Sequence, residues 1–172
     1  MSPSRIAIIG PQSTGKSVLA ESLAKHFGTT WVPEFARGYA EGKGAQLDIS
    51  DVEKIAEGHL ASEAAMALRA KDYLFVDTDI IMTLLYSQIY YGQIPAKVKS
   101  LCETKRYELT LVTTPDVPWI DDPQRDILNR DDFFDRCIHE VKVYKRSFAI
   151  IRGNWKDRFE SAVRLVEGLG TK

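Results

Sequence analysis

The chain has 172 residues, of which 44% are hydrophobic, and this length and composition suit one globular domain with one core. Its formal net charge of −1 lacks the basic balance typical of nucleic-acid-binding proteins. Neither a charged leader nor a long apolar stretch opens the chain, so we expect no signal peptide and no membrane-spanning helix. Cys102 and Cys137 have no metal-like spacing and indicate reduced thiols in a cytoplasmic protein.

Strands and helices are predicted to alternate along the chain. Residues 5–9 form a short β-branched run typical of a buried strand, and residues 16–27 have the apolar spacing of a helix. The same patterns predict strands at 29–32, 73–76, 109–112 and 148–151, and helices at 52–70, 80–91, 96–104, 132–143 and 156–169. This alternation predicts an α/β fold in which helices cover both faces of a parallel sheet.

Two segments fit neither pattern. Residues 35–48 and 115–131 are expected to be irregular, and long irregular segments in a compact domain are often lids or binding loops. We therefore assign a lid to residues 115–131, within a single domain that spans residues 1–172.

A complete phosphate-binding motif lies between the first predicted strand and the first predicted helix. Residues 10–17 read GPQSTGKS and match the pattern G-x-x-x-x-G-K-[ST]. Gly10 and Gly15 allow backbone angles that turn successive N–H groups toward one anion. Lys16 can reach the β- and γ-phosphates, and the Ser17 hydroxyl can bind Mg²⁺. The expected nucleotide-binding set is Gly10, Ser13, Thr14, Gly15, Lys16, Ser17 and Val18.

Carboxylates follow the second and third predicted strands. Asp77 ends the third strand at the edge where a carboxylate can act on Mg²⁺ or its waters. Asp79 can bind substrate or cap the next helix, and both roles remain open. After the second strand, Glu34 can accept the proton of an attacking hydroxyl and Arg37 can hold a phosphate oxygen. A surface ion pair is the alternative for these two residues.

The segment after the fourth strand combines an aromatic ring, acids and arginines. Arg125 and Arg130 can close over the γ-phosphate and neutralise charge in the transition state. Trp119 can stack on an aromatic base or anchor the lid. Asp121 and Asp122 lie between Trp119 and Arg125. The alternative for the whole segment is a polar surface loop.

These residues resemble the ribosylnicotinamide kinase domain of the NadR family, within the small P-loop AAA-like ATPases and kinases. Four segments carry the similarity in family order, namely GPQSTGKS, PEFAR, FVDTD and PWIDDPQRD, and it covers almost the whole chain. It implies a three-layer P-loop NTPase fold like that of nucleoside kinases, with strand order 2-3-1-4-5 and a lid. Longer family members add a DNA-binding region and an adenylyltransferase domain, and we expect neither in this chain.

The resemblance implies that the chain uses ATP and Mg²⁺ to phosphorylate a small nucleoside, with nicotinamide riboside as the acceptor. The catalytic set that it implies is Lys16, Glu34, Asp77, Arg125 and Arg130, with Ser17 and Asp77 at the metal. The implied acceptor-binding set is Glu34, Arg37, Asp79, Trp119 and Asp122, where the nearby acids suit a cationic ring. Such kinases place adenine after the fifth strand, where Asn154 and Trp155 lie, although Asn154 can instead cap a helix.

Two alternatives remain at this point. One is a kinase for another small metabolite or nucleoside, and the other is an NTP-binding switch with slow hydrolysis. A switch needs a partner surface, and no segment of the sequence looks like a separate partner-binding domain. We expect no nucleic-acid or membrane partner, and the oligomeric state stays open.

Overall fold

The computed structural model describes residues 2–44, 46–120 and 129–171 and confirms the predicted parallel sheet. Its strands are β1 (Ser4–Ile9), β2 (Thr30–Val32), β3 (Tyr73–Asp77), β4 (Leu109–Thr113) and β5 (Phe148–Ile151). They pair in parallel in the order β2-β3-β1-β4-β5, as the resemblance implies. The chain therefore moves outward from β1 in both directions, which opens a crevice at the carboxyl ends of the central strands.

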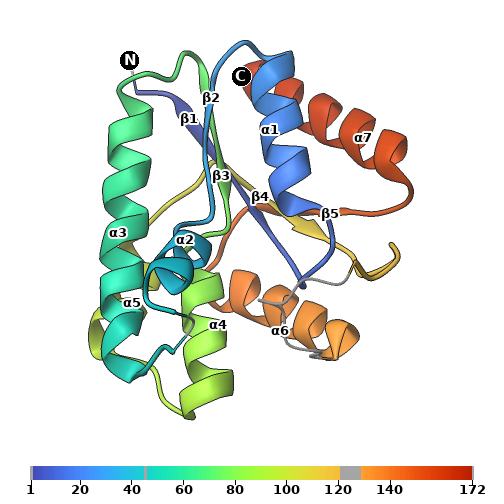
Figure 1. The fold of residues 1–172 in the computed structure, drawn as a ribbon. Coiled ribbons are helices and arrows are strands. Elements are labelled where there is room, and N and C mark those ends of the chain that lie inside the picture. The colour runs from blue at the N-terminus through green and yellow to red at the C-terminus, as the bar shows by residue number, and fades with distance from the viewer. Residues whose placement is uncertain (1, 45, 121–128, 172) are drawn as a thin grey trace.

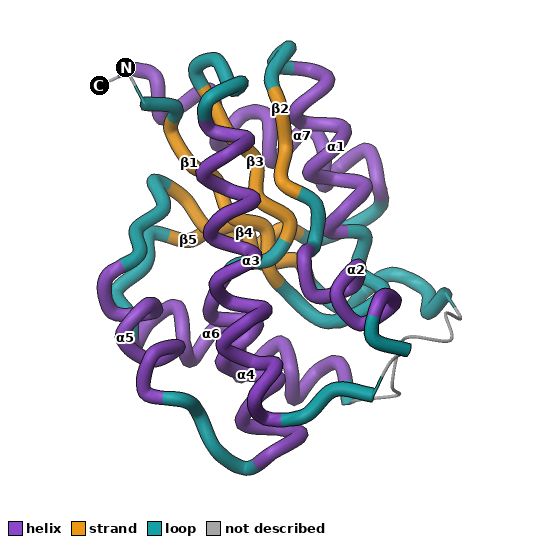
Figure 2. Tube along the Cα trace, turned by 60° about the vertical axis from the view of Figure 1, so that its left-hand side comes forward, coloured by secondary structure: helices purple, strands orange, loops and turns teal. Residues whose placement is uncertain are grey.

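Helices cover both faces of this sheet, as Figure 1 shows. The helices are α1 (Lys16–His26), α2 (Phe35–Gly42), α3 (Ile49–Ala67), α4 (Ile80–Tyr91), α5 (Ala96–Thr104), α6 (Arg130–Val143) and α7 (Trp155–Glu167), followed by a 3₁₀ turn at Gly168–Thr171. α1 and α7 pack on one face, while α3, α4, α5 and α6 occupy the other. Figure 2 shows α3 on the near side of the strands, opposite α1 and α7.

The core follows the alternation of side chains along β1. Ile6 and Ile8 are fully buried against Leu23 of α1 on one face of the sheet. Ile9 points to the other face and packs in a second cluster with Ile81 of α4. Because both faces of the strand are buried, the sequence of β1 is continuously apolar rather than alternating.

The expectation that residues 35–48 are irregular is wrong, because α2 occupies the first half of this segment. The helix has two glycines in eight residues and no buried residue, so its intrinsic propensity is weak. Tertiary contacts hold it on α3 instead. A Cβ built at Gly58 would lie 2.0 Å from Cζ of Phe35, so the Phe35 ring occupies the space of a missing side chain. The Tyr39 hydroxyl also donates to Asp51 at 2.8 Å.

The expected lid is described only at its two ends. Residues 115–120 follow β4 without regular structure, and residues 130 and 131 belong to α6. Asn129 caps that helix by accepting from the N–H groups of Asp131 and Asp132, which moves the helix start two residues earlier than predicted. Asp121, Asp122 and Arg125 lie outside the described residues.

A buried carboxylate ties α3 to the start of the sheet. Glu63 is 1% exposed and accepts from the Lys105 ammonium at 2.5 Å and from the Tyr107 hydroxyl at 2.9 Å. The Arg5 guanidinium lies 2.9 Å from the same carboxylate. Two hydrogen-bond donors and an ion pair with Arg5 thus stabilise one buried anion, which makes its removal costly for the groups left behind.

We predict that Glu63→Ala lowers the free energy of unfolding by about 3 kcal/mol, because it leaves Tyr107 and two cations without their acceptor. Urea unfolding measures the effect. The matched control is Glu57→Ala, which breaks an exposed pair with Lys97 and should cost less than about 1 kcal/mol. Equal losses in the two variants would contradict the role given to Glu63.

Candidate active site

A cavity of about 340 Å³ opens at the carboxyl ends of β1, β2 and β3. One side of it is the phosphate loop, residues 12–18, with Ile120 and Trp155 at the margin. The other side is formed by α2, α3 and α4. The lining residues on that side are Glu34, Ala36, Arg37, Ala40, Leu47, Asp48, Val52, Ile55, Thr78, Met82, Thr83, Tyr86, Ser87, Tyr90 and Tyr91. A polar phosphate-binding half therefore continues into a half that is largely apolar and aromatic.

The phosphate loop has the geometry that its motif requires. Gly15 has φ +77°, and a Cβ there would lie 2.1 Å from the Trp155 ring, so only glycine fits this position. Lys16 lines the cavity and donates from Nζ to the Pro11 carbonyl at 2.9 Å, which curls its side chain over the loop. The structure thus brings Ser13, Thr14, Gly15, Lys16, Ser17 and Val18 together at the cavity, as expected.

Ser17 and Asp77 lie together at the base of the phosphate-binding half of the cavity. The Ser17 hydroxyl donates to Oδ2 of Asp77 at 2.5 Å, and Oδ1 of Asp77 is buried without a hydrogen-bond partner among the described residues. Burial raises the pKa of Asp77 to about 6, and the Lys16 ammonium opposes this shift. An uncompensated carboxylate oxygen beside a hydroxyl is an arrangement that suits a divalent cation.

Asp79 lies behind the cavity wall. It is 1% exposed, and its Oδ1 accepts from the Ile81 N–H at 2.8 Å, which caps α4. Burial raises its pKa to about 6 against the opposing charge of Arg146. The capping alternative is therefore realised, and a direct contact of Asp79 with substrate stays a prediction. Between the two aspartates, Thr78 lines the cavity with φ +67°, a strained angle for a β-branched residue.

Glu34 lines the side of the cavity opposite the phosphate loop. It precedes α2 but makes no capping hydrogen bond, so its carboxylate is not used in starting that helix. Burial is the main cause of the raised pKa values of Asp77 and Tyr86, and the negative charge of Glu34 also raises both. Arg37 also lines the cavity, and its Nε lies 3.6 Å from Oε1 of Glu41. This pair with Glu41 differs from the Glu34–Arg37 ion pair named as the alternative, which stays open.

The described ends of the lid rest on the phosphate loop. The Arg130 guanidinium donates to the carbonyls of Val117 at 2.9 Å and Ser13 at 3.4 Å, and its Cζ lies 5.9 Å from the Trp119 ring centroid. The Ile120 N–H donates to the Ser13 hydroxyl at 2.7 Å. Trp119 thus packs on an arginine here, while stacking on a substrate and the transition-state role of Arg130 stay predictions.

The turn before α7 supplies the other margin. The Trp155 ring covers Gly15 and is 50% exposed, which leaves a face open beside the loop. Asn154 accepts from the Asp157 N–H at 3.0 Å and so caps α7. The expected nucleotide-binding role of Trp155 is consistent with its place in the cavity wall, and that of Asn154 stays a prediction.

Sequence reasoning missed the tyrosines of α4. The Tyr86 and Tyr90 rings stack with centroids 5.8 Å apart and an interplanar angle of 10°, and Tyr91 completes the wall. The signal was present in the sequence, because residues four apart on a helix share a face and this helix begins just after Asp77. Asp48 and Leu47 at the start of α3 also line the cavity and were missed.

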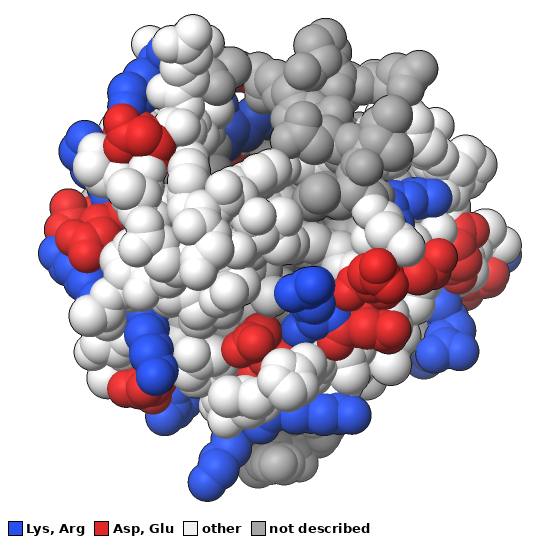
Figure 3. Space-filling model, turned by 90° about the horizontal axis from the view of Figure 1, so that it is seen from below, with Lys and Arg blue, Asp and Glu red and all other residues white. Residues whose placement is uncertain are grey.

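Lys, Arg, Asp and Glu side chains are mixed around this edge of the molecule. Figure 3 shows both signs of charge beside a broad uncharged area, in the part of the face that the structure describes. Within the described residues, no group of three or more His, Cys, Asp or Glu side chains is placed to hold a metal, and no helix has the length and apolarity to cross a membrane.

Comparison with known proteins confirms the resemblance to NadR. The chain is 29% identical over 170 residues to the trifunctional NAD biosynthesis/regulator protein NadR of Salmonella typhimurium, and 29% identical over 169 residues to that of Escherichia coli. These alignments cover 94% of this chain but only 42% and 41% of the relatives. The chain thus spans about two fifths of the length of the curated relatives that it matches.

Solved structures share the fold. A crystal structure of NadR protein in complex with NR has a TM-score of 0.82 at 22% identity, covering 99% of this chain and 52% of that one. A NadR structure with NAD and AMP-PNP has a TM-score of 0.80 at 21% identity, covering 99% and 50%. Thymidylate kinase from Candida albicans follows with a TM-score of 0.67 at 13% identity, covering 97% and 92%. These similarities confirm the P-loop kinase fold.

The family assignment comes from a broader match. A family model described as an AAA domain matches residues 5–158, which include the phosphate loop, Asp77 and the turn before α7. This match covers most of the sheet and the helices on both of its faces. The chain belongs to the AAA domain family.

Proposed function

We propose that this chain is an ATP-dependent kinase that phosphorylates a hydroxyl of a small nucleoside, with nicotinamide riboside as the acceptor. The observation that carries the proposal is one cavity lined by the phosphate loop, by Glu34 and by the aromatic side chains of α4. The NadR relatives, and the NadR structures described with NR and with AMP-PNP, support the choice of both substrates.

Each side chain in this arrangement has its own role in phosphoryl transfer. Lys16 and the loop N–H groups hold the triphosphate, so that the γ-phosphoryl group faces the aromatic half of the cavity. Glu34 accepts the proton of the acceptor hydroxyl as the new oxygen–phosphorus bond forms and the bond to the ADP oxygen breaks. Arg37 lies on the same wall and can stabilise charge on the transferred group.

The residues at the floor fit Mg²⁺. The unpartnered Oδ1 of Asp77 and the Ser17 hydroxyl lie together, and the missing ligands are those that phosphate oxygens and water supply in such sites. When bound, Mg²⁺ neutralises charge on the β- and γ-phosphates. Ser17 and Asp77 then orient the triphosphate from the side opposite the acceptor.

The tyrosines of α4 that line the cavity support an acceptor with a flat ring. Tyr86 and Tyr90 present stacked rings, and apolar side chains of α3 such as Val52 and Ile55 face them. Aromatic faces attract cationic rings, and the carboxylates of Glu34 and Asp48 in the same wall favour positive charge. Nicotinamide riboside combines a flat ring with a positive charge. We also propose a cytoplasmic location, which the two buried, unpaired cysteines support.

Competition between acceptors tests the function. With ATP and Mg²⁺, we expect nicotinamide riboside to be phosphorylated in preference to ordinary nucleosides and water, with the products identified by mass. Glu34→Gln keeps the size of the side chain but removes the base, so transfer should fall at least about 10²-fold while ATP affinity stays within about twofold. Hydrolysis alone, at a rate indifferent to Glu34→Gln, would replace the kinase with an NTP-binding switch.

Lys16→Ala tests the phosphate-binding half. The variant should fold normally but lose about 10²- to 10³-fold in kcat, because one charged donor to the transferring group is removed. Lys25→Ala is the matched control, since Lys25 is an exposed lysine at the other end of the same helix. Steady-state kinetics of both variants check the prediction, and normal turnover by folded Lys16→Ala protein would contradict it.

Asp77→Asn should separate catalysis from stability. Burial raises the pKa of Asp77 from 3.8 to about 6, so the ligand-free folded state binds this proton more tightly than the unfolded state. Ionisation of Asp77 therefore lowers stability as the pH rises from about 4 through 6. Above pH 6, Asp77→Asn should be more stable than the wild type by at most about 3 kcal/mol, and the difference should shrink toward pH 4.

Urea unfolding with EDTA at several pH values measures this difference, and the same variant should lose Mg²⁺-dependent transfer. A stability difference that does not change with pH would show that Asp77 carries no ionisation penalty.

A further inference from the structure

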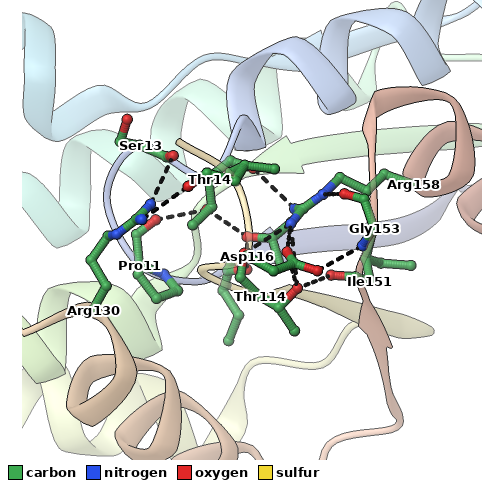
Figure 4. Close-up of polar contacts among 12 residues, drawn as sticks. Pro11, Ser13, Thr14, Thr114, Asp116, Arg130, Ile151, Gly153 and Arg158 are labelled. Atoms are coloured by element: carbon green, nitrogen blue, oxygen red, sulfur yellow. Dashed lines mark hydrogen bonds and ion pairs between the residues drawn. The ribbon is translucent and has the colours of Figure 1, made fainter. Parts of the chain in front are cut away.

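Arg158 of α7 has a buried guanidinium that contacts three parts of the chain. It is 1% exposed, and it donates to carbonyls of three separate segments (Figure 4). Its Nε donates to Gly153 at 2.7 Å, one terminal nitrogen donates to Thr14 at 3.2 Å, and the other donates to Thr114 at 2.9 Å. The side chain thus joins the turn before α7, the phosphate loop and the segment after β4.

An acidic residue neutralises this buried charge. Asp116 forms an ion pair with Arg158 and also accepts from the Gly153 N–H at 2.8 Å. Burial lowers the pKa of Arg158, and Asp116 opposes that shift. Asp116 therefore accounts for the charge of Arg158 but not for its three carbonyl contacts.

The contact with Thr14 bears on phosphate binding through the geometry of one peptide group. The Thr14 carbonyl and the Gly15 N–H belong to the same planar unit and point in opposite directions. A donor that holds the carbonyl on the outside of the loop therefore keeps the N–H directed inward. A cation at the oxygen also polarises the peptide and strengthens the N–H as a donor.

The neighbouring peptide group is held in the same way from the other side. Arg130 of α6 donates to the Ser13 carbonyl, which shares its peptide with the Thr14 N–H. The Trp155 ring lies 5.8 Å from the Arg158 guanidinium and against Gly15. The outer surface of residues 13–15 is thus shaped by side chains from two distant helices.

We propose that Arg158 is a positioning residue of the phosphate loop, which acts by holding the Thr14 carbonyl so that the Gly15 N–H faces the triphosphate. The inference rests on the proposed use of this loop for ATP. It also means that the turn before α7 and the phosphate loop move as one unit, because Gly153 and Thr14 share the same guanidinium.

Binding of inorganic tripolyphosphate with Mg²⁺, measured by calorimetry, tests this role without the base or the acceptor. Arg158→Gln should weaken binding at least about 10-fold, because the loop N–H groups lose their fixed direction. Arg158→Lys keeps the charge but cannot form the fork of three contacts, so it should stay several-fold weaker than the wild type. For the reaction, both variants should raise the KM for ATP more than they lower kcat.

Asp116→Asn separates positioning from stability. It removes the partner charge of a buried arginine and should lower Tm, yet it keeps the carbonyl contacts of Arg158. Its affinity for tripolyphosphate should therefore stay within about twofold of the wild type. Circular dichroism confirms that each variant is folded at the temperature of the binding measurement.

Different results of these experiments contradict different proposals. Wild-type tripolyphosphate affinity in folded Arg158→Gln overturns the inference, and so does an equal loss of affinity in Asp116→Asn. Wild-type protein that binds tripolyphosphate but phosphorylates no nucleoside overturns the kinase proposal alone, since the effect of Arg158 on the loop is still measured.

Discussion

A phosphate loop that directs its N–H groups to one side must leave its carbonyls on the other, and buried carbonyls need donors. In this chain some donors come from the motif itself and others from distant helices. The Pro11 carbonyl accepts from Lys16 and from the Thr14 hydroxyl, the Ser13 carbonyl from Arg130, and the Thr14 carbonyl from Arg158. The helices after β1, β4 and β5 are thereby tied to one loop, which makes that loop the point on which the arrangement of the site depends.

At the carboxyl edge of the sheet, residues of the candidate site have arrangements that lower stability. Asp77 is fully buried, Oδ1 has no hydrogen-bond partner among the described residues, and burial disfavours its charged form. Thr78 beside it has a strained backbone, and Glu34 adds a second negative charge. Glu63, at the start of the sheet, has two hydrogen-bond donors and an ion pair with Arg5 for one carboxylate. The carboxylate of the candidate site lacks the full set of partners that the structural carboxylate has.

Local sequence patterns predicted the strands, the loop and Asp77, because each depends on neighbours within a few residues. The apolar run of β1 and the glycines of the loop fix their conformations almost alone. α2 was missed, since its glycines argue against a helix and only its contacts with α3 stabilise it. Arg158 has no local signature either. In sequence it is one cation on an amphipathic helix, and its three carbonyl partners lie 5, 44 and 144 residues away.

The contact of Phe35 with Gly58 links a residue outside the cavity lining to the shape of the proposed acceptor pocket. α2 carries Ala36, Arg37 and Ala40 into the cavity wall, and its distance from α3 is set by a ring resting where a methyl group is absent. Gly58 itself is not among the lining residues of the described chain. A carbon added at Gly58 would force the Phe35 ring, which α2 carries, to shift, while every residue that lines the cavity keeps its identity. Related chains can therefore differ in acceptor preference because of the residue at this position. A comparison restricted to pocket residues would not include it.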